Sequence, residues 1–245
     1  NWFDLATLGA YSVALSLAFT PAMMTARLHG SVALPMFSRC KENAAELRRA
    51  VASSSQLVCL AGGLLAMLFV LAGSWMIGVL YSEKYLIAQQ VVPWIGALCA
   101  VRVARCTPSM LSIALGDTKI PLYSNLARAA SFGVAALLLA QGFDVVWAPI
   151  CGFAGELAAY SASLALLRVR HNAPVGESLR CFLGTAVVVG IALVIARGAG
   201  GSVAASPLAA TLGGVALLAY AIASGGSLRD LLRSALAKPF GVQRG

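Results

Sequence analysis

Four charged side chains interrupt otherwise apolar segments of this sequence, and their chemistry makes them the first candidates for a functional site. Arg102 and Arg105 lie three residues apart in the apolar run 87–114, so they project from the same face of a helix. Arg128 lies in the next apolar run and Glu156 in the one after it. A charged group inside a membrane costs at least about 2.5–3.5 kcal/mol, so such residues indicate a cavity, a partner or a function.

The three arginines have the chemistry to bind an anion. Guanidinium groups match phosphate oxygens with two parallel hydrogen bonds, and the run 87–114 contains no acid that would neutralise them. We therefore predict that Arg102, Arg105 and Arg128 bind a diphosphate or a similar anion. Two alternatives stay open. The arginines could pair with acids or carbonyls of neighbouring helices, and Arg128 could reach the lipid headgroups.

Glu156 is the acid within these runs, and we expect it to act in coupling or gating. It follows Gly152 and Gly155, small residues that allow two helices to approach closely. A structural or gating pair with Arg128 or Arg102 is the favoured interpretation. A carrier of a coupling proton is the alternative, because burial and a nearby arginine act on a carboxyl in opposite directions.

No other pattern predicts chemistry. The sequence has no Gly-x-x-x-x-Gly-Lys loop, no His-Glu-x-x-His pair and no nucleophile arrangement. Its six cysteines contain no Cys-x-x-Cys pair, and we expect them to act as small apolar residues. His29 and His171 fall in predicted polar loops and indicate no metal site. We therefore expect a protein that is not an enzyme and that needs no cofactor or metal.

The elements that must position these residues are membrane helices. Hydrophobic residues make up 60% of the chain and charged residues 11%, whereas a soluble domain is about half apolar and a quarter charged. The apolar runs are long and continuous, which predicts spanning helices. We predict an all-α polytopic transmembrane bundle of about seven spans, at 5–28, 53–72, 87–114, 121–141, 145–167, 180–197 and 206–223.

Two polar segments predict short amphipathic helices at the membrane surface. In the loop 38–52, Asn43 followed by Glu46 resembles a capping box, and Leu47, Ala50 and Val51 would form one apolar stripe. A solvated connector is the alternative for this loop. The basic tail 227–245 has a similar apolar stripe.

The distribution of basic residues predicts the orientation. The net charge of +9 is interpreted as topological, and no nucleic-acid partner is expected. Thirteen Lys and Arg residues lie in one set of loops and two in the opposite set, with the other three inside spans. This asymmetry predicts a cytoplasmic C-terminus. The four tryptophans, Trp2, Trp75, Trp94 and Trp147, all fall near the opposite boundary.

Several segments in order resemble a known family. They are LGAYSVA at 8–14, LPMFSR at 34–39, ALGDTK at 114–119 and PLYSNLAR at 121–128. Together they resemble the Wzx-type polysaccharide or O-antigen flippases of the multidrug/oligosaccharidyl-lipid/polysaccharide exporter superfamily, in their C-terminal half. The resemblance covers roughly residues 1–170.

The resemblance implies the second lobe of a two-lobe exporter. Residues 1–170 would form that lobe, and 171–245 would add two spans and a basic tail. The substrate would be an undecaprenyl-diphosphate-linked oligosaccharide, moved across the bacterial inner membrane by alternating access around a cationic cavity, for surface polysaccharide or lipopolysaccharide. Partners would be membrane lipids, a glycan polymerase and chain-length regulators. Upstream helices are expected to be missing, and this chain alone is expected to be inactive.

Other functions stay open at this point. A drug or cation antiporter of the same superfamily would favour a carboxylate-centred cavity, whereas arginines outnumber acids within these spans. A flippase for lipid-linked peptidoglycan precursors is compatible with the same charges. A glycan polymerase or ligase would need a large outer loop, and the longest one predicted is 73–86. A scaffold that transports nothing is the remaining class.

Overall fold

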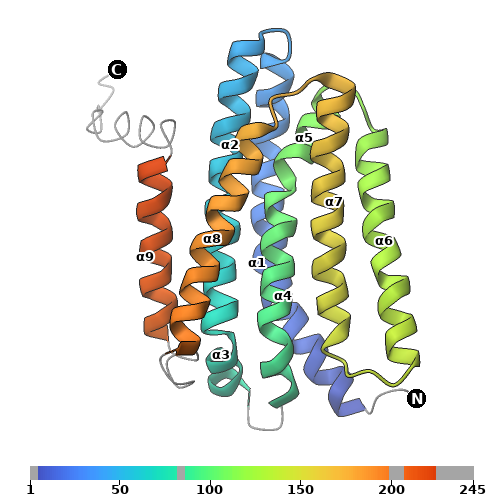
Figure 1. Cartoon of the computed structure of the whole chain (residues 1–245), viewed down its shortest axis with the longest axis vertical. Coiled ribbons are helices and arrows are strands. Elements are labelled where there is room, and N and C mark those ends of the chain that lie inside the picture. Colours follow the sequence, from blue (N-terminus) through green and yellow to red (C-terminus); the bar gives the residue numbers. More distant parts are fainter. Residues whose placement is uncertain (1–4, 82–85, 199–206, 225–245) are drawn as a thin grey trace, which may run out of the picture.

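The computed structural model describes residues 5–81, 86–198 and 207–224, which form long helices lying side by side (Figure 1). The helices are α1 (Leu5–Cys40), α2 (Ala44–Ala66), α3 (Gly73–Leu80), α4 (Leu86–Ala104), α5 (Cys106–Ala114), α6 (Lys119–Ala140), α7 (Trp147–His171), α8 (Gly176–Gly198) and α9 (Pro207–Ser224). A five-residue π-helix, Met67–Leu71, continues α2.

The structure confirms an all-helical membrane bundle. Five helices in the described ranges are long and apolar enough to cross a membrane: Leu5–Cys40, Ala44–Leu71, Ala88–Ala114, Lys119–Ala140 and Trp147–His171. They coincide with the first five predicted spans. Helices α8 and α9 coincide with the last two, and that these two cross the membrane stays a prediction. The predicted helix in the tail lies outside the described residues.

Helix α1 is longer than predicted. Its 36 residues continue through Pro21 and Pro35 to Cys40, whereas the sequence predicted an end near residue 28. The hydroxyl of Thr25 donates to the Pro21 carbonyl at 2.8 Å, a local side-chain bond to the preceding turn of the helix. The prediction that His29 lies in a polar loop was therefore wrong, because His29 is inside this helix.

The prediction of a short surface helix within 38–52 was also wrong. Helix α1 continues to Cys40, and α2 begins at Ala44 and continues into the membrane. Asn43 is nevertheless the N-cap of α2, because its side chain accepts from the backbone N–H groups of Ala45 and Glu46. The apolar stripe expected there packs inward rather than onto lipid, and Val51 is fully buried.

One predicted span is interrupted at a single residue, Arg105, whose backbone stays in the right-handed helical region. Helix α4 ends at Ala104 and α5 begins at Cys106, so Arg105 lies between them. Pro108 explains the break, since it has no N–H to offer the carbonyl four residues earlier. The predicted outer loop 73–86 likewise contains a short helix, α3.

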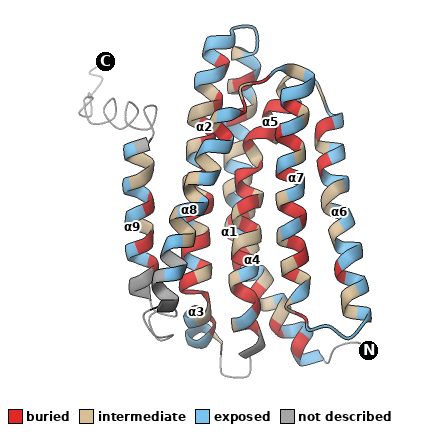
Figure 2. Ribbon diagram, in the orientation of Figure 1, coloured by how far each residue is buried: buried red, intermediate tan, exposed pale blue. Residues whose placement is uncertain are grey.

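Helix α4 is the centre of the bundle and α6 its edge. Helix α4 packs against α1, α2, α3 and α7, whereas α6 packs mainly against α7. Figure 2 shows the same difference, with buried residues along α4 and exposed ones along α6. Leu122, Leu126 and Leu137 of α6 are all exposed. Exposed leucines on an apolar helix are what a lipid-facing surface requires.

Candidate functional site

A single buried carboxylate joins the three arginines. Oε1 of Glu156 lies 2.6 Å from Nη2 of Arg102 and 3.5 Å from Nη1 of Arg128. Oε2 lies 3.2 Å from Nε of Arg105. The Nε of Arg102 also donates to Oε1 at 2.7 Å. Residues from α4, the α4–α5 break, α6 and α7 therefore meet at one point, within about one turn of the middle of their spans.

This cluster carries a net positive charge. One carboxylate neutralises one guanidinium, so two of the three positive charges have no anionic partner in the cluster. The Glu156 side chain is 1% exposed, and the arginine side chains are exposed by 11% at Arg105 and up to 28% at Arg128. A carboxylate without solvent is stable only beside such partners. The partly exposed guanidinium groups remain accessible to a second anion.

Neighbouring polar and aromatic groups hold the arginines in place. Nη1 of Arg105 lies within hydrogen-bond distance of Ser124 Oγ (3.4 Å) and Asn125 Oδ1 (3.3 Å) on α6. The Arg102 guanidinium lies over the ring of Phe19, 4.7 Å from its centre, which is a cation–π contact. The sequence analysis missed these contacts, because the partners are uncharged and lie on other helices.

A hollow of about 450 Å³ opens beside the cluster. All three arginines line it, together with apolar side chains such as Phe19 and Met23 of α1 and Phe132 of α6. Its wall therefore combines guanidinium groups with aromatic and aliphatic surface. Such a wall suits a ligand with an anionic group next to an apolar one.

The structure brings all four predicted site residues together. Of the alternatives for the arginines, pairing with an acid on a neighbouring helix is realised, since Glu156 comes from α7. The predicted pair of Glu156 with Arg128 or Arg102 is present with both, and Arg105 is added. Arg128 contacts this cluster through Glu156. Whether the four residues bind substrate or gate transport stays a prediction.

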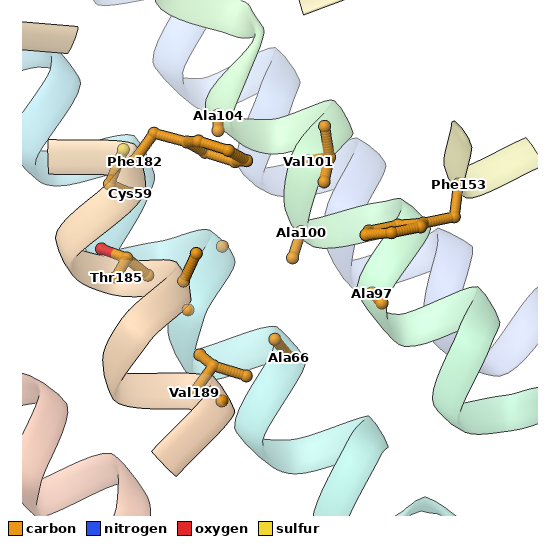
Figure 3. A pocket seen from close by; sticks show the side chains of 14 residues that line it. Cys59, Ala66, Ala97, Ala100, Val101, Ala104, Phe153, Phe182, Thr185 and Val189 are labelled. Carbon is orange, nitrogen blue, oxygen red and sulfur yellow. The ribbon is translucent and has the colours of Figure 1, made fainter. Parts of the chain in front are cut away.

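A second, apolar hollow lies on the other side of α4 (Figure 3). Its volume is about 210 Å³, and small residues of α2 and α4 such as Gly62, Ala66 and Ala100 form much of its wall. Phe153 of α7 and Phe182 of α8 also border it. No charged side chain lines it. The two hollows thus have opposite chemistry, and only the first suits an anion.

The GDTK turn at residues 116–119 forms a separate charged contact with the C-terminal end of α7. Oδ2 of Asp117 accepts from His171 at 3.0 Å and from Arg170 at 3.1 Å, and Oδ1 accepts from the backbone N–H of Lys119 at 3.0 Å. These contacts, with His171 first, lower the pKa of Asp117 to about 2. The turn between α5 and α6 is thereby attached to the end of α7.

A further polar network lies between α1, α2 and α5, and no sequence pattern had indicated it. Nε2 of His29 lies 3.1 Å from Ser54 Oγ and 3.4 Å from Thr107 Oγ1, and the two hydroxyls are 2.9 Å apart. Ser54 and Thr107 are almost fully buried. Serine and threonine are too common in membrane helices for spacing alone to reveal such a contact.

The fold and site together define a multi-pass helical membrane protein with a buried cationic cluster. Residues 1–90 match the model of a family described as polysaccharide biosynthesis protein. The match confirms the predicted resemblance, is consistent with a Wzx-type flippase family, and indicates a role in polysaccharide biosynthesis or export. No curated protein and no solved structure matches the chain. The matched region contains α1 and α2 and ends before the four charged residues.

Proposed function

We propose that this chain takes part in moving a lipid-linked oligosaccharide across the bacterial cytoplasmic membrane for surface polysaccharide synthesis. The substrate would carry its sugars on undecaprenyl diphosphate, and the chain itself would catalyse no reaction. The basic loops favour a cytoplasmic C-terminus. Glycan polymerase and chain-length regulator proteins are the proposed partners, with membrane lipid around the bundle.

The observation that carries this proposal is the charge of the cluster. A diphosphate diester has two negative charges, and the cluster has two guanidinium charges that Glu156 does not neutralise. A diphosphate in the adjacent hollow would therefore complete the neutralisation. The apolar side chains of that hollow would lie next to the lipid-linked end of the headgroup.

The same charge argues against a cation antiporter. A cation in this hollow would lie beside the exposed parts of three guanidinium groups. The positive charges would repel the cation. A structural scaffold would also pair Glu156 with arginine, but it would not need two further positive charges near the middle of a membrane, each costly to insert. The excess charge favours an anionic ligand.

The proposal can be tested by complementation. A bacterium lacking its polysaccharide flippase would receive the intact gene that contains this sequence, and surface glycan would be measured. Restored glycan is the expected result. The double variant Arg102→Ala/Arg105→Ala should abolish that glycan while the amount of protein in the membrane stays unchanged. Normal glycan in the double variant would exclude a diphosphate site at these residues.

The matched control is Arg48→Ala/Arg49→Ala. It removes two arginines that are exposed near the start of α2 and outside the cluster. Glycan should persist in this control. Equal loss in both double variants would show that only the total charge matters.

A further inference from the structure

We propose that His29, Ser54 and Thr107 form a proton-binding site whose occupancy is coupled to the cationic cluster. The protonation of His29 is independent of the proposed function, whereas the coupling rests on it. The site lies in the membrane bundle where α1, α2 and α5 meet. Nothing in the cluster around Glu156 contributes to it.

The geometry lets the network accept either protonation state of the imidazole. With Nε2 unprotonated, Ser54 donates its hydroxyl proton to Nε2 over 3.1 Å, and Thr107 donates to Ser54 over 2.9 Å. With Nε2 protonated, the ring donates to Ser54 and Ser54 donates to Thr107, after rotation of the two hydroxyl groups. A hydroxyl both donates and accepts, so neither state leaves a ring nitrogen facing these groups without a partner. Histidine is the side chain whose ordinary titration falls between pH 5 and 8.

Among the described residues, the charged and titratable groups on the helices that meet here form no hydrogen bond or ion pair with His29. They include Arg27 on α1, Glu46, Arg48, Arg49 and Cys59 on α2, Arg102 on α4, Arg105 between α4 and α5, and Cys106 on α5. Glu46 and the arginines of α1 and α2 are exposed, and Arg102 and Arg105 contact Glu156. Within the described part of the chain, His29 has its hydrogen bonds to the two hydroxyls and forms no ion pair.

In this arrangement, the proposed proton-binding site at His29 is separate from the proposed anion-binding site around Glu156. Glu156, the other candidate for a coupling proton, already contacts three guanidinium groups. His29 has neutral partners, so its charge can change without breaking an ion pair. The sequence had suggested only Glu156 for this role.

A short covalent path connects the two sites. Thr107 is the second residue of α5, and Arg105 lies in the break that precedes α5. Reorientation of the Thr107 hydroxyl therefore acts two residues from a guanidinium of the cluster. Arg105 donates its backbone N–H to the Val101 carbonyl and accepts from the Ser109 N–H, so helical backbone joins the two segments and a shift of Thr107 is transmitted to Arg105.

The protonation can be measured directly because the chain has two histidines. In the variant His171→Gln, His29 is the only imidazole left. The full chain would be labelled with ¹⁵N-histidine in lipid nanodiscs, and the imidazole shifts followed from pH 5 to pH 8.5. We expect reversible titration in this range. Ser54→Ala should move its midpoint by about half a pH unit or more, the size expected from one neutral hydrogen bond.

Ser53→Ala is the matched control, since the Ser53 hydroxyl donates to the Arg49 carbonyl and not to His29. If Ser54→Ala prevents folding, Thr107→Val removes the other hydroxyl with little change of shape. The proton site is excluded if the imidazole does not titrate in this range. It is also excluded if the hydroxyl variants titrate like Ser53→Ala.

The coupling has its own measurement. Farnesyl diphosphate serves as the probe, and its Kd would be measured at pH 5.5 and pH 7.5 in the unchanged chain and in His29→Gln. Ionisation of the probe is the same for both proteins, so it cancels in the comparison. We expect the ratio of the two Kd values to differ between the proteins by about fivefold or more.

The two experiments can fail separately. Equal ratios in both proteins would exclude coupling between the sites. Absence of binding to the unchanged chain would contradict the proposed function and the coupling together. In that case the titration alone would still decide whether His29 binds a proton.

Discussion

At the scale of single residues, Glu156 forms more ion pairs than any other charged side chain in the described ranges. Its two oxygens contact three guanidinium groups, and its side chain is 1% exposed. Removing one member of a buried ion pair leaves a charge without compensation, which costs more than the pair contributes. Glu156 therefore determines whether three arginines can remain inside the bundle.

We expect Glu156→Gln to destabilise the protein by about 3–5 kcal/mol, the usual cost of breaking a buried ion pair. Thermal unfolding of the purified chain in detergent measures the effect. Glu42→Gln is the control, because Glu42 is exposed in the turn before α2 and should change little. Equal unfolding temperatures for Glu156→Gln and the unchanged chain would show that the arginines do not depend on this carboxylate.

Asp117 gives a prediction about pH. Its contacts with His171 and Arg170 lower its pKa to about 2 from an ordinary 3.8. A lowered pKa in the folded state means that the ionised carboxylate stabilises the fold above about pH 4 and loses this effect as the pH falls through about 2. Asp117→Asn should therefore lower the unfolding temperature at pH 5 and make a progressively smaller difference toward pH 2.

Asp144→Asn is the control for this measurement, since Asp144 is exposed in the turn between α6 and α7 at the other end of the bundle. It should show no such pH dependence. A difference between Asp117→Asn and the unchanged chain that stays constant from pH 5 to pH 2 would contradict the stabilising role of the ionised carboxylate.

At the scale of helices, the close contact of α6 with α7 positions Glu156. Gly155 precedes Glu156, and a Cβ atom there would overlap the hydroxyl of Ser131 on α6. Gly152 similarly faces Leu98 on α4, and a Cβ would lie 2.6 Å from its side chain. These glycines allow α7 to approach both neighbours closely enough for its carboxylate to reach their arginines.

Gly155→Ala should destabilise the chain by about 1–3 kcal/mol, because the added methyl group forces α6 and α7 apart. The effect would be measured as a lower unfolding temperature. The double variant Gly155→Ala/Ser131→Gly should recover part of the loss, since it removes the side chain that the methyl group meets. If the double variant unfolds at the same temperature as Gly155→Ala, the overlap with Ser131 is not the cause of the lost stability.

The sequence predicted features that depend on one helix, and it missed contacts that depend on the packing of several helices. Arg102 and Arg105 share a face of one helix, so their spacing predicted that they act together. Their distance from Glu156 depends on how α7 packs against α4, which no local pattern encodes. The contact of His29 with Ser54 and Thr107 has the same origin. The extension of α1 was missed because Arg27, His29 and Pro35 resemble loop residues when taken without their neighbours.

At the scale of the whole molecule, two hollows of opposite polarity lie on different sides of α4. The hollow beside the arginines cannot face hydrocarbon, because partly exposed guanidinium groups near the middle of a membrane need water, protein or an anion around them. Helix α6 thus has two environments: Arg128 and Phe132 line the cationic hollow, whereas Leu137 is exposed on the opposite face.

A cysteine scan of α6 should distinguish these environments. Phe132→Cys should react with a negatively charged thiol reagent about tenfold faster than with a positively charged one, since the arginines raise the local concentration of anions. Leu137→Cys, on the lipid face, should react with neither. Mass spectrometry of the labelled peptides separates these sites from the six native cysteines. Equal rates of Phe132→Cys with both reagents would show that the hollow has no net positive potential.

The position of Glu156 on α7 also sets an order for the biogenesis of the protein. The ribosome synthesises Arg102, Arg105 and Arg128 before it synthesises the acid that neutralises them. We therefore predict that α4 and α6 stay beside the insertion machinery until α7 emerges, and that these helices enter the lipid as a group. In a glycosylation-mapping assay, a nascent chain ending at residue 146 should integrate poorly, and one ending at residue 172 should integrate fully. Equal integration of both chains would show that each arginine helix enters the membrane alone.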